Sequence, residues 1–302
     1  SRQTVEAKHI IIATGGSSRE LPAMKIDGKK IIGYREAMTL PEMPKSMIVV
    51  GSGAIGIEFA YFYNSMGTKV TVVEFLPRIV PLEDEDISKE LEKQYKKYGI
   101  GIMTSSEVTA VDTTGNGVKA TVKSAAGETV LEADVLLSAV GVAANIEGIG
   151  LETLGIKTEK GKVLVDKFGQ TNIPGVYAIG DCAPGHALAH VASKEAIVCV
   201  EAIAYNENKY KHKPEPIDYN NIPGCTYCVP EIASVGYTEK AAKEAGYEIK
   251  VGKFPLSASG KASAAGHTEG FVKVIFDAKY GEWLGTHMIG YNVTEMIAQT
   301  VT

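Results

Sequence analysis

This sequence has few cysteines, no excess of basic over acidic residues and no long apolar run, and each of these absences excludes a class of protein. Four cysteines in 302 residues are too few for a disulfide scaffold, so we expect a reducing compartment: the cytoplasm, or the mitochondrial matrix in a eukaryote. The net charge of −5 offers no basic surface to nucleic acid or to an anionic membrane. No apolar run approaches the ~18 residues that a membrane span needs, and residues 1–15 lack the basic-then-apolar order of a secretory signal.

The remaining composition is typical of a globular protein, and its apolar pattern predicts an α/β region followed by an α+β region. We expect a buried strand at 9–13, a fully buried strand at 47–50, further strands at 70–73, 133–138 and 176–179, and helices at 55–66, 86–98 and 188–206. Glycine turns separate several short strands between 106 and 138. Beyond a polar, proline-bearing linker at 209–216, we expect strands near 232–236, 247–253, 271–276 and 284–289 and a helix at 238–245. Both ends resemble cuts through structure, so we expect this sequence to be part of a longer protein.

A glycine-rich turn links the strand at 47–50 to the helix that follows. Its sequence is Gly51-Ser52-Gly53-Ala54-Ile55-Gly56, and a G-x-G-x-x-G between a strand and a helix is typical of dinucleotide binding. Gly51 permits the tight turn, Gly53 lets a pyrophosphate approach the backbone, and Gly56 lets the helix pack closely on the strand. The helix N-terminus supplies free N–H groups for the phosphates. The alternative is that these glycines merely end a strand.

Glu74 ends the returning strand at 70–73 and suggests which dinucleotide binds. A carboxylate at this position can accept hydrogen bonds from the ribose hydroxyls of NAD, and it would repel the additional phosphate of NADP. Arg78 lies beyond the strand end, after Pro77, and is not placed to accommodate that phosphate. The sequence therefore predicts NAD as the cofactor, with a merely solvated strand end as the alternative reading of Glu74.

A second strand-end carboxylate leads to a family resemblance. Asp181 closes the motif Thr171-x-x-Pro174-Gly175-Val176-Tyr177-Ala178-Ile179-Gly180-Asp181, where it suits the hydroxyl of a polyol. This motif, with Thr14-Gly15-Gly16 and the glycine turn, resembles the two-dinucleotide-fold flavoprotein disulfide reductases. Stretches at 72–79, 188–190, 230–236 and 270–274 extend the resemblance over essentially the whole chain and favour the dihydrolipoamide dehydrogenase branch of that family.

The resemblance implies a fold and two cofactor sites. The fold would be α/β, a Rossmann-like NAD domain with a partial FAD domain, followed by an α+β dimerisation domain. The implied segments are 1–40 (remnant of the FAD domain), 41–141 (NAD domain), 142–213 (returning FAD or central domain) and 214–302 (incomplete dimerisation domain). The implied NAD contacts are Gly51, Ser52, Gly53, Ala54, Ile55, Gly56, Glu58, Glu74, Val108 and Gly141. The implied FAD contacts are Thr14, Gly15, Gly16, Asp181, Ala187, Leu188, Ala189 and His190.

Three of these residues have more specific implied roles. Val108 would lie near the adenine of NAD, Asp181 would bind the ribityl chain of FAD, and Glu58 would face the contact between nicotinamide and flavin. From the residues alone, Glu58 is equally well explained as a first-turn helix carboxylate that the helix dipole favours.

The chemistry of the family requires groups that this sequence does not contain. The resemblance implies that dihydrolipoamide reduces a C-x-x-x-x-C pair, that the pair reduces FAD, and that FAD passes a hydride to NAD. None of Cys182, Cys199, Cys225 and Cys228 has that spacing, and the family's first FAD-binding glycine motif and its His–Glu base are absent. We therefore expect no catalytic residue in this chain, and a chain that is inactive alone, binds NAD weakly and loses FAD.

The pair Cys225-x-x-Cys228 invites a redox or metal interpretation. It has no second ligand pair and does not open a helix, so we interpret it as buried structural thiols and expect no metal. Two departures from the family pattern bear on cofactor contacts. Val142-Ala143-Ala144 stands where Arg-Arg-Pro is usual, and Gly16 replaces a usual Ser.

The predicted parent protein is a dihydrolipoamide:NAD oxidoreductase. We expect an isologous homodimer that serves lipoyl-bearing subunits of 2-oxo acid dehydrogenase or glycine cleavage complexes. Two alternatives stay open. One is another NAD(P)H-disulfide reductase of the family, such as a mercuric, glutathione-type or coenzyme A disulfide reductase, although Glu74 disfavours those that use NADP. The other is a non-catalytic NAD-binding and dimerising module.

Overall fold

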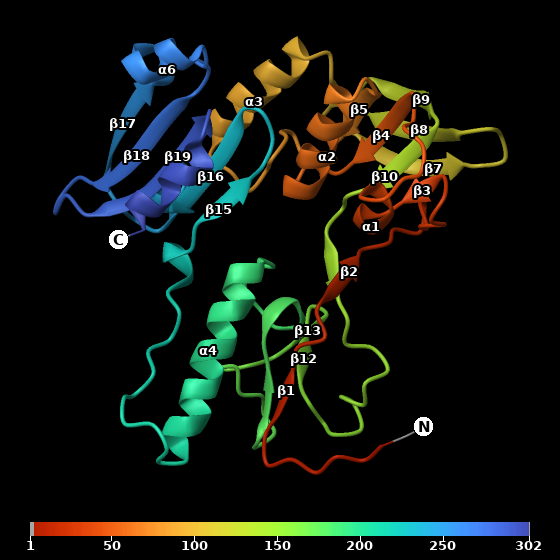
Figure 1. Ribbon diagram of the computed structural model, residues 1–302. Helices are drawn as coiled ribbons and strands as arrows, with labels where there is room; N and C mark the ends of the chain where they lie inside the picture. The colour runs from red at the N-terminus through yellow and green to blue at the C-terminus, as the bar shows by residue number, and fades with distance from the viewer. Residues whose placement is uncertain (1–2, 302) are drawn as a thin grey trace. The chain divides into compact units, whose positions relative to one another are not determined.

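The computed structural model describes residues 3–301, which fall into two compact units (Figure 1). The first unit comprises residues 1–17 and 142–219, and the second comprises residues 18–141 and 220–302. Each unit has its own apolar core. No helix in the described part of the chain is long and apolar enough to cross a membrane.

A five-stranded parallel sheet forms the centre of the second unit, in the order β3-β10-β4-β5-β6. Its strands are short apolar runs because both faces of the sheet are buried. Met47 and Val49 pack on one face with Ile57, and the alternate residues Ile48 and Val50 pack on the other. The strands are β3 (Ile31–Ile32), β4 (Ser46–Val50), β5 (Lys69–Val73), β6 (Gly101–Met103) and β10 (Val135–Ser138).

Different elements cover the two faces of this sheet. Helices α2 (Ala54–Ser65) and α3 (Glu85–Lys97) bury their apolar sides on the Met47 face. Asp84 caps α3, since its carboxylate accepts a hydrogen bond from the Asp86 amide. The other face packs against the antiparallel sheet of β7 (Glu107–Asp112), β8 (Val118–Ser124) and β9 (Gly127–Ala133). A short helix, α1 (Tyr34–Ala37), follows β3.

An antiparallel sheet, β15-β16-β19-β18-β17, completes the second unit. Its four long strands and the helix after β16 match the predicted α+β pattern, whereas β15 and α6 were not predicted. The strands are β15 (Gly224–Thr226), β16 (Glu231–Gly236), β17 (Ile249–Pro255), β18 (Phe271–Asp277) and β19 (Trp283–Gly290); the helices are α5 (Glu239–Glu244), α6 (Gly260–Ala265) and α7 (Val293–Met296).

The first unit contains only small sheets and one long helix. Parallel strands β1 (Ile10–Ile12) and β14 (Val176–Ala178) pair in register, and α4 (Ala189–Asn206) is the long helix expected after them. The strand predicted at 9–13 is present as β1, but the prediction that it is buried was wrong, because Ile10 is 52% exposed. Within residues 3–301, β1 has β14 as its only partner, so neighbouring strands do not enclose it. The remaining pairs are β2 (Gly16–Ser18) with β11 (Val142–Ala144) and β12 (Thr158–Glu159) with β13 (Lys162–Val163).

Candidate functional site

The glycine turn after β4 has the backbone that its sequence predicted. Gly51 adopts φ +97°, and a Cβ there would lie 2.4 Å from the carbonyl oxygen of Ala139. A Cβ on Gly56 would lie 2.0 Å from the carbonyl oxygen of Gly51, so only glycine lets α2 start this close to the turn. At Gly53 a Cβ would meet nothing within 4 Å. Gly53 therefore faces open space, as the expected approach of a pyrophosphate to the backbone requires.

An open cleft of about 520 Å³ lies at the carboxyl ends of β4, β5 and β10. Six residues expected to bind NAD line it: Gly51, Ser52, Gly53, Glu74, Val108 and Gly141. The other four, Ala54, Ile55, Gly56 and Glu58, continue into α2 and do not line it. Open α/β sheets bind ligands in the crevice beyond the carboxyl ends of their strands, so this cleft is the candidate site.

Glu74 lines this cleft and is buried, with 6% of its surface exposed. One carboxylate oxygen accepts hydrogen bonds from the amide (2.8 Å) and the hydroxyl (2.6 Å) of Ser52, and the other accepts from the Leu76 amide (2.8 Å). The reading of Glu74 as a solvated strand end is therefore wrong. A carboxylate has about four acceptor positions, so Glu74 keeps capacity for another donor while it fixes the glycine turn.

Glu58 lies in the second turn of α2, which begins at Ala54, so its interpretation as a first-turn carboxylate was wrong. Its Oε1 accepts a hydrogen bond from the Tyr227 amide at 2.8 Å, and burial raises the pKa of this carboxyl above its usual value. The bond ties α2 to the segment that follows β15 within the second unit.

The two cysteines of the Cys225-x-x-Cys228 pair have different surroundings. Cys228 is buried, its thiol lies 3.1 Å from the Pro230 carbonyl oxygen, and burial raises the pKa of that thiol to about 12. Cys225 is only half-buried, on β15. Both are free thiols, and the high pKa of Cys228 disfavours the thiolate that nucleophilic or metal-binding chemistry needs.

The residues expected to bind FAD lie in the first unit. Ile12 pairs with Ala178, so the segments beginning at Thr14 and at Gly180 leave the same end of two parallel strands. A Cβ on Gly16 would lie 3.3 Å from Oδ2 of Asp181, which places these two candidates together. Leu188 is the N-cap of α4, and its neighbours in the expected site are exposed at the start of that helix: Ala187, Ala189 and His190.

The two departures from the family pattern are in contact with each other. A Cβ on Gly16 would lie 2.4 Å from Cγ1 of Val142, because β2 and β11 are paired. The valine side chain thus occupies the space that a serine at position 16 would need.

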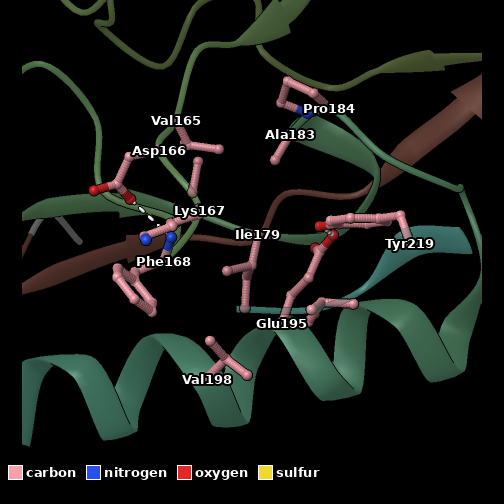
Figure 2. Close-up of a pocket in the computed structure, with 13 residues that line it drawn as sticks. Val165, Asp166, Lys167, Phe168, Ile179, Ala183, Pro184, Glu195, Val198 and Tyr219 are labelled. Atoms are coloured by element: carbon pink, nitrogen blue, oxygen red, sulfur yellow. Dashed lines mark hydrogen bonds between the residues drawn. The ribbon is translucent and has the colours of Figure 1, made fainter. Parts of the chain in front are cut away.

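Glu195 is a structural contributor that sequence reasoning missed. It projects from α4, and its Oε2 accepts a hydrogen bond from the Gly180 amide at 2.6 Å, immediately before Asp181. The Tyr219 hydroxyl donates to the other oxygen at 2.6 Å, and burial, followed by this carboxylate, raises the pKa of Tyr219. Figure 2 shows the two side chains meeting beside a cavity of about 30 Å³, far too small for a nucleotide. No sequence motif marks a helical glutamate of this kind.

Fold and site together define a class of protein. The family of pyridine nucleotide-disulphide oxidoreductases matches residues 1–196, and the dimerisation domain of that family matches residues 222–302. The chain therefore belongs to the pyridine nucleotide-disulphide oxidoreductases, which confirms the predicted family and fold class.

Within this family the chain is a homologue of the dihydrolipoyl dehydrogenases. It is 52% identical to that of Rhizobium etli over 97% of the chain and 60% of the relative, and 48% identical to that of Zymomonas mobilis over 97% and 62%. The crystal structure of LpdA from Mycobacterium tuberculosis matches with a TM-score of 0.87 at 29% identity, over 98% of this chain and 62% of that one. The chain thus spans about 60% of the length of the curated relatives it matches.

Proposed function

We propose that the second unit binds NAD in the cleft at the carboxyl ends of β4, β5 and β10, as the electron-accepting part of a protein that oxidises dihydrolipoamide. The observation that carries this proposal is the convergence of six predicted contacts on one cleft (Gly51, Ser52, Gly53, Glu74, Val108 and Gly141). Gly51 and Gly141 are far apart in the sequence, yet both line this cleft. Their proximity in the fold therefore supports the proposed site independently of the glycine motif.

Different residues of the cleft suit different parts of the NAD molecule. The open approach at Gly53 and the free N–H groups of the α2 N-terminus suit the pyrophosphate. Glu74 suits the ribose hydroxyls, and its negative charge opposes the additional phosphate of NADP. NAD, when bound, supplies the chemistry of hydride acceptance. The chain contributes binding, orientation and a preorganised backbone.

The first unit would contribute to an FAD site in the same protein. The adjacency of Gly16 and Asp181 and the exposed start of α4 fit the flavin and its ribityl chain, and Glu195 would hold the turn that presents Asp181. Bound FAD would supply two-electron relay chemistry. The sequence holds one G-x-G-x-x-G, which is assigned here to NAD, so we expect this chain alone to retain little FAD.

For the whole protein, we propose oxidation of protein-bound dihydrolipoamide to lipoamide with reduction of NAD⁺ to NADH. The names of the relatives support this reaction, and the dimerisation domain supports a homodimer. Lipoyl-bearing subunits of 2-oxo acid dehydrogenase or glycine cleavage complexes would be its partners, in the cytoplasm. We also propose the segments 1–40, 41–141, 142–213 and 214–302 as remnant FAD, NAD, returning FAD and dimerisation regions.

Calorimetric titration of this chain with NAD⁺ and with NADP⁺ tests the proposal. We expect NAD⁺ to saturate the cleft and NADP⁺ to bind at least tenfold more weakly, because Glu74 opposes its extra phosphate. Failure of NAD⁺ to bind, or a preference for NADP⁺, would overturn it. Turnover of dihydrolipoamide by this chain alone would contradict the expectation that it is inactive, since its cysteines lack the required spacing.

A further inference from the structure

One cation lies among the residues that line the cleft of the second unit. The charged lining residues are Arg19, Glu74 and Glu107. Glu74 accepts three hydrogen bonds from Ser52 and Leu76, and within residues 3–301 neither Glu74 nor Glu107 forms an ion pair with Arg19. The pyrophosphate of a dinucleotide carries two negative charges, and burying them against a cleft requires positive charge or hydrogen-bond donors.

The backbone of Arg19 is anchored at the same sheet edge as the glycine turn. Its amide donates a hydrogen bond to the Gly141 carbonyl oxygen at 3.0 Å, and the Ala139 amide donates to Val50 at 2.8 Å. Gly51 in turn packs directly on Ala139. The ends of β4 and β10 therefore hold Arg19 beside the turn through a short series of backbone contacts.

The side chain of Arg19 is available for a ligand, unlike that of Arg78. One terminal nitrogen of Arg78 donates to the Pro81 carbonyl oxygen at 2.9 Å, and the other lies 3.4 Å from Glu85. Arg78 does not line the cleft. Across residues 3–301, the exposed guanidinium of Arg19 makes no ion pair with a carboxylate.

We propose that Arg19 is a cofactor-binding residue whose guanidinium pairs with the pyrophosphate of NAD, across the cleft from the N-terminus of α2. This inference rests on the proposed binding of NAD. The planar guanidinium can donate two parallel hydrogen bonds to a phosphate group, and the helix N-terminus adds a partial positive charge from the other side. Arg19 therefore supplies the cation that the glycine turn itself lacks.

Calorimetry on this chain and three variants tests the assignment, with ADP-ribose, NAD⁺, NADP⁺ and adenosine as ligands. Arg19→Gln should weaken ADP-ribose and NAD⁺ roughly tenfold or more, because a charge-assisted hydrogen bond is lost. Adenosine, which has no phosphate, should bind as before. The affinity of Arg19→Lys for NAD⁺ should lie between those of the unmodified chain and Arg19→Gln, since lysine keeps the charge but not the planar guanidinium. Arg35→Gln is the matched control, because Arg35 is exposed on α1 of the same unit and does not line the cleft.

The outcomes separate this inference from the proposed function. If the unmodified chain binds neither NAD⁺ nor ADP-ribose, the proposed function fails and the role of Arg19 fails with it. If binding is intact but Arg19→Gln resembles Arg35→Gln, the role of Arg19 alone is overturned. If Arg19→Gln lost as much affinity for adenosine as for NAD⁺, Arg19 would either contact the nucleoside or support the fold, and it would not bind the pyrophosphate. A larger loss for NADP⁺ than for NAD⁺ would assign it to the 2′-phosphate, against the proposal.

Discussion

The two strand-end acids of this chain occupy equivalent topological positions but differ in their surroundings. Glu74 follows β5, inside a five-stranded sheet, and is buried with three hydrogen bonds. Asp181 follows β14, in a two-stranded sheet, and is half-buried beside Gly16. The same chain pattern thus lines a cleft with a buried carboxylate in one unit and leaves a carboxylate half-buried in the other. Within this chain, the carboxylate at the end of the five-stranded sheet is the more enclosed of the two.

The charged clusters of the two units differ in the same way. In the second unit, Lys273 is 3% exposed and lies 2.8 Å from Asp84, 2.8 Å from Glu239 and 3.2 Å from Asp86. This cluster joins the start of α3 to β18 and α5, so it links the parallel sheet region to the antiparallel sheet. In the first unit, Glu207 gathers Lys8, His9 and Lys209 at the surface.

The largest effect should come from breaking the buried cluster. Lys273→Met would leave carboxylates without their shared cation, and removal of one partner from a buried ion pair typically destabilises by about 3–5 kcal/mol. Urea unfolding followed by fluorescence measures this directly, because Trp283 on β19 is the chain's single tryptophan and reports on the second unit.

Lys250→Met on β17 is the matched control, since Lys250 is exposed and such substitutions usually stay within about 0.5 kcal/mol. Equal midpoints for the two variants would show that the burial of Lys273 has no energetic consequence.

The next effect separates the structural glycine of the turn from the ligand-facing glycine. Gly56→Ala would force a methyl group against the Gly51 carbonyl oxygen, and overpacking of this kind costs about 1–3 kcal/mol. Gly53→Ala meets no atom within 4 Å, so stability should change by less than about 0.5 kcal/mol. NAD⁺ affinity should nevertheless fall roughly tenfold, because the methyl group blocks the pyrophosphate.

Urea titrations and calorimetry on both variants give the two readouts. The distinction between a structural Gly56 and a ligand-facing Gly53 would fail if Gly53→Ala were as unstable as Gly56→Ala. It would also fail if Gly53→Ala bound NAD⁺ normally.

Local patterns explain why parts of this architecture were predictable and others were not. The turn at Gly51 and the acid at Glu74 were identifiable because one continuous strand–turn–helix–strand segment carries both. Arg19 and Glu195 were not, because each acts through a segment distant in sequence: Gly141 for one, and Gly180 with Tyr219 for the other. The exposure of Ile10 was mispredicted because an apolar run reveals strand propensity but not how many strands flank it.

A smaller effect should appear at acid pH. Burial raises the pKa of Asp84, but hydrogen bonds from Lys273 and from backbone amides lower it overall. Burial also raises the pKa of Asp86, and hydrogen bonds from Lys273 and Lys253 lower it overall. Hydrogen bonds from Lys243 and Lys273 lower the pKa of Glu239. Carboxyls with lowered folded pKa values contribute stability above their unfolded values of 3.8 and 4.5, and this contribution is lost as pH falls through the folded values.

The contribution of these three carboxyls to the unfolding free energy should therefore be constant near neutral pH and decline below about pH 4.5. In Lys273→Met the acid decline should be shallower, because the main cause of the lowered pKa values is gone. Urea midpoints between about pH 3 and pH 7, read from Trp283, measure both slopes. Parallel slopes in the two proteins would place the acid-sensitive groups elsewhere.

The smallest effect is expected from the surface cluster of the first unit, and it completes the comparison. Lys209, Lys8 and His9 lower the pKa of Glu207 through hydrogen bonds, yet the lysines are 73% and 76% exposed. Solvent and salt screen such pairs, and holding long side chains in place offsets the attraction. Glu207→Gln should consequently leave the unfolding midpoint unchanged at physiological salt. Circular dichroism is the suitable probe, because the first unit contains no tryptophan. A clear drop in the midpoint would mean that an exposed cluster can stabilise its unit as a buried one does, and burial would no longer explain the difference between the two.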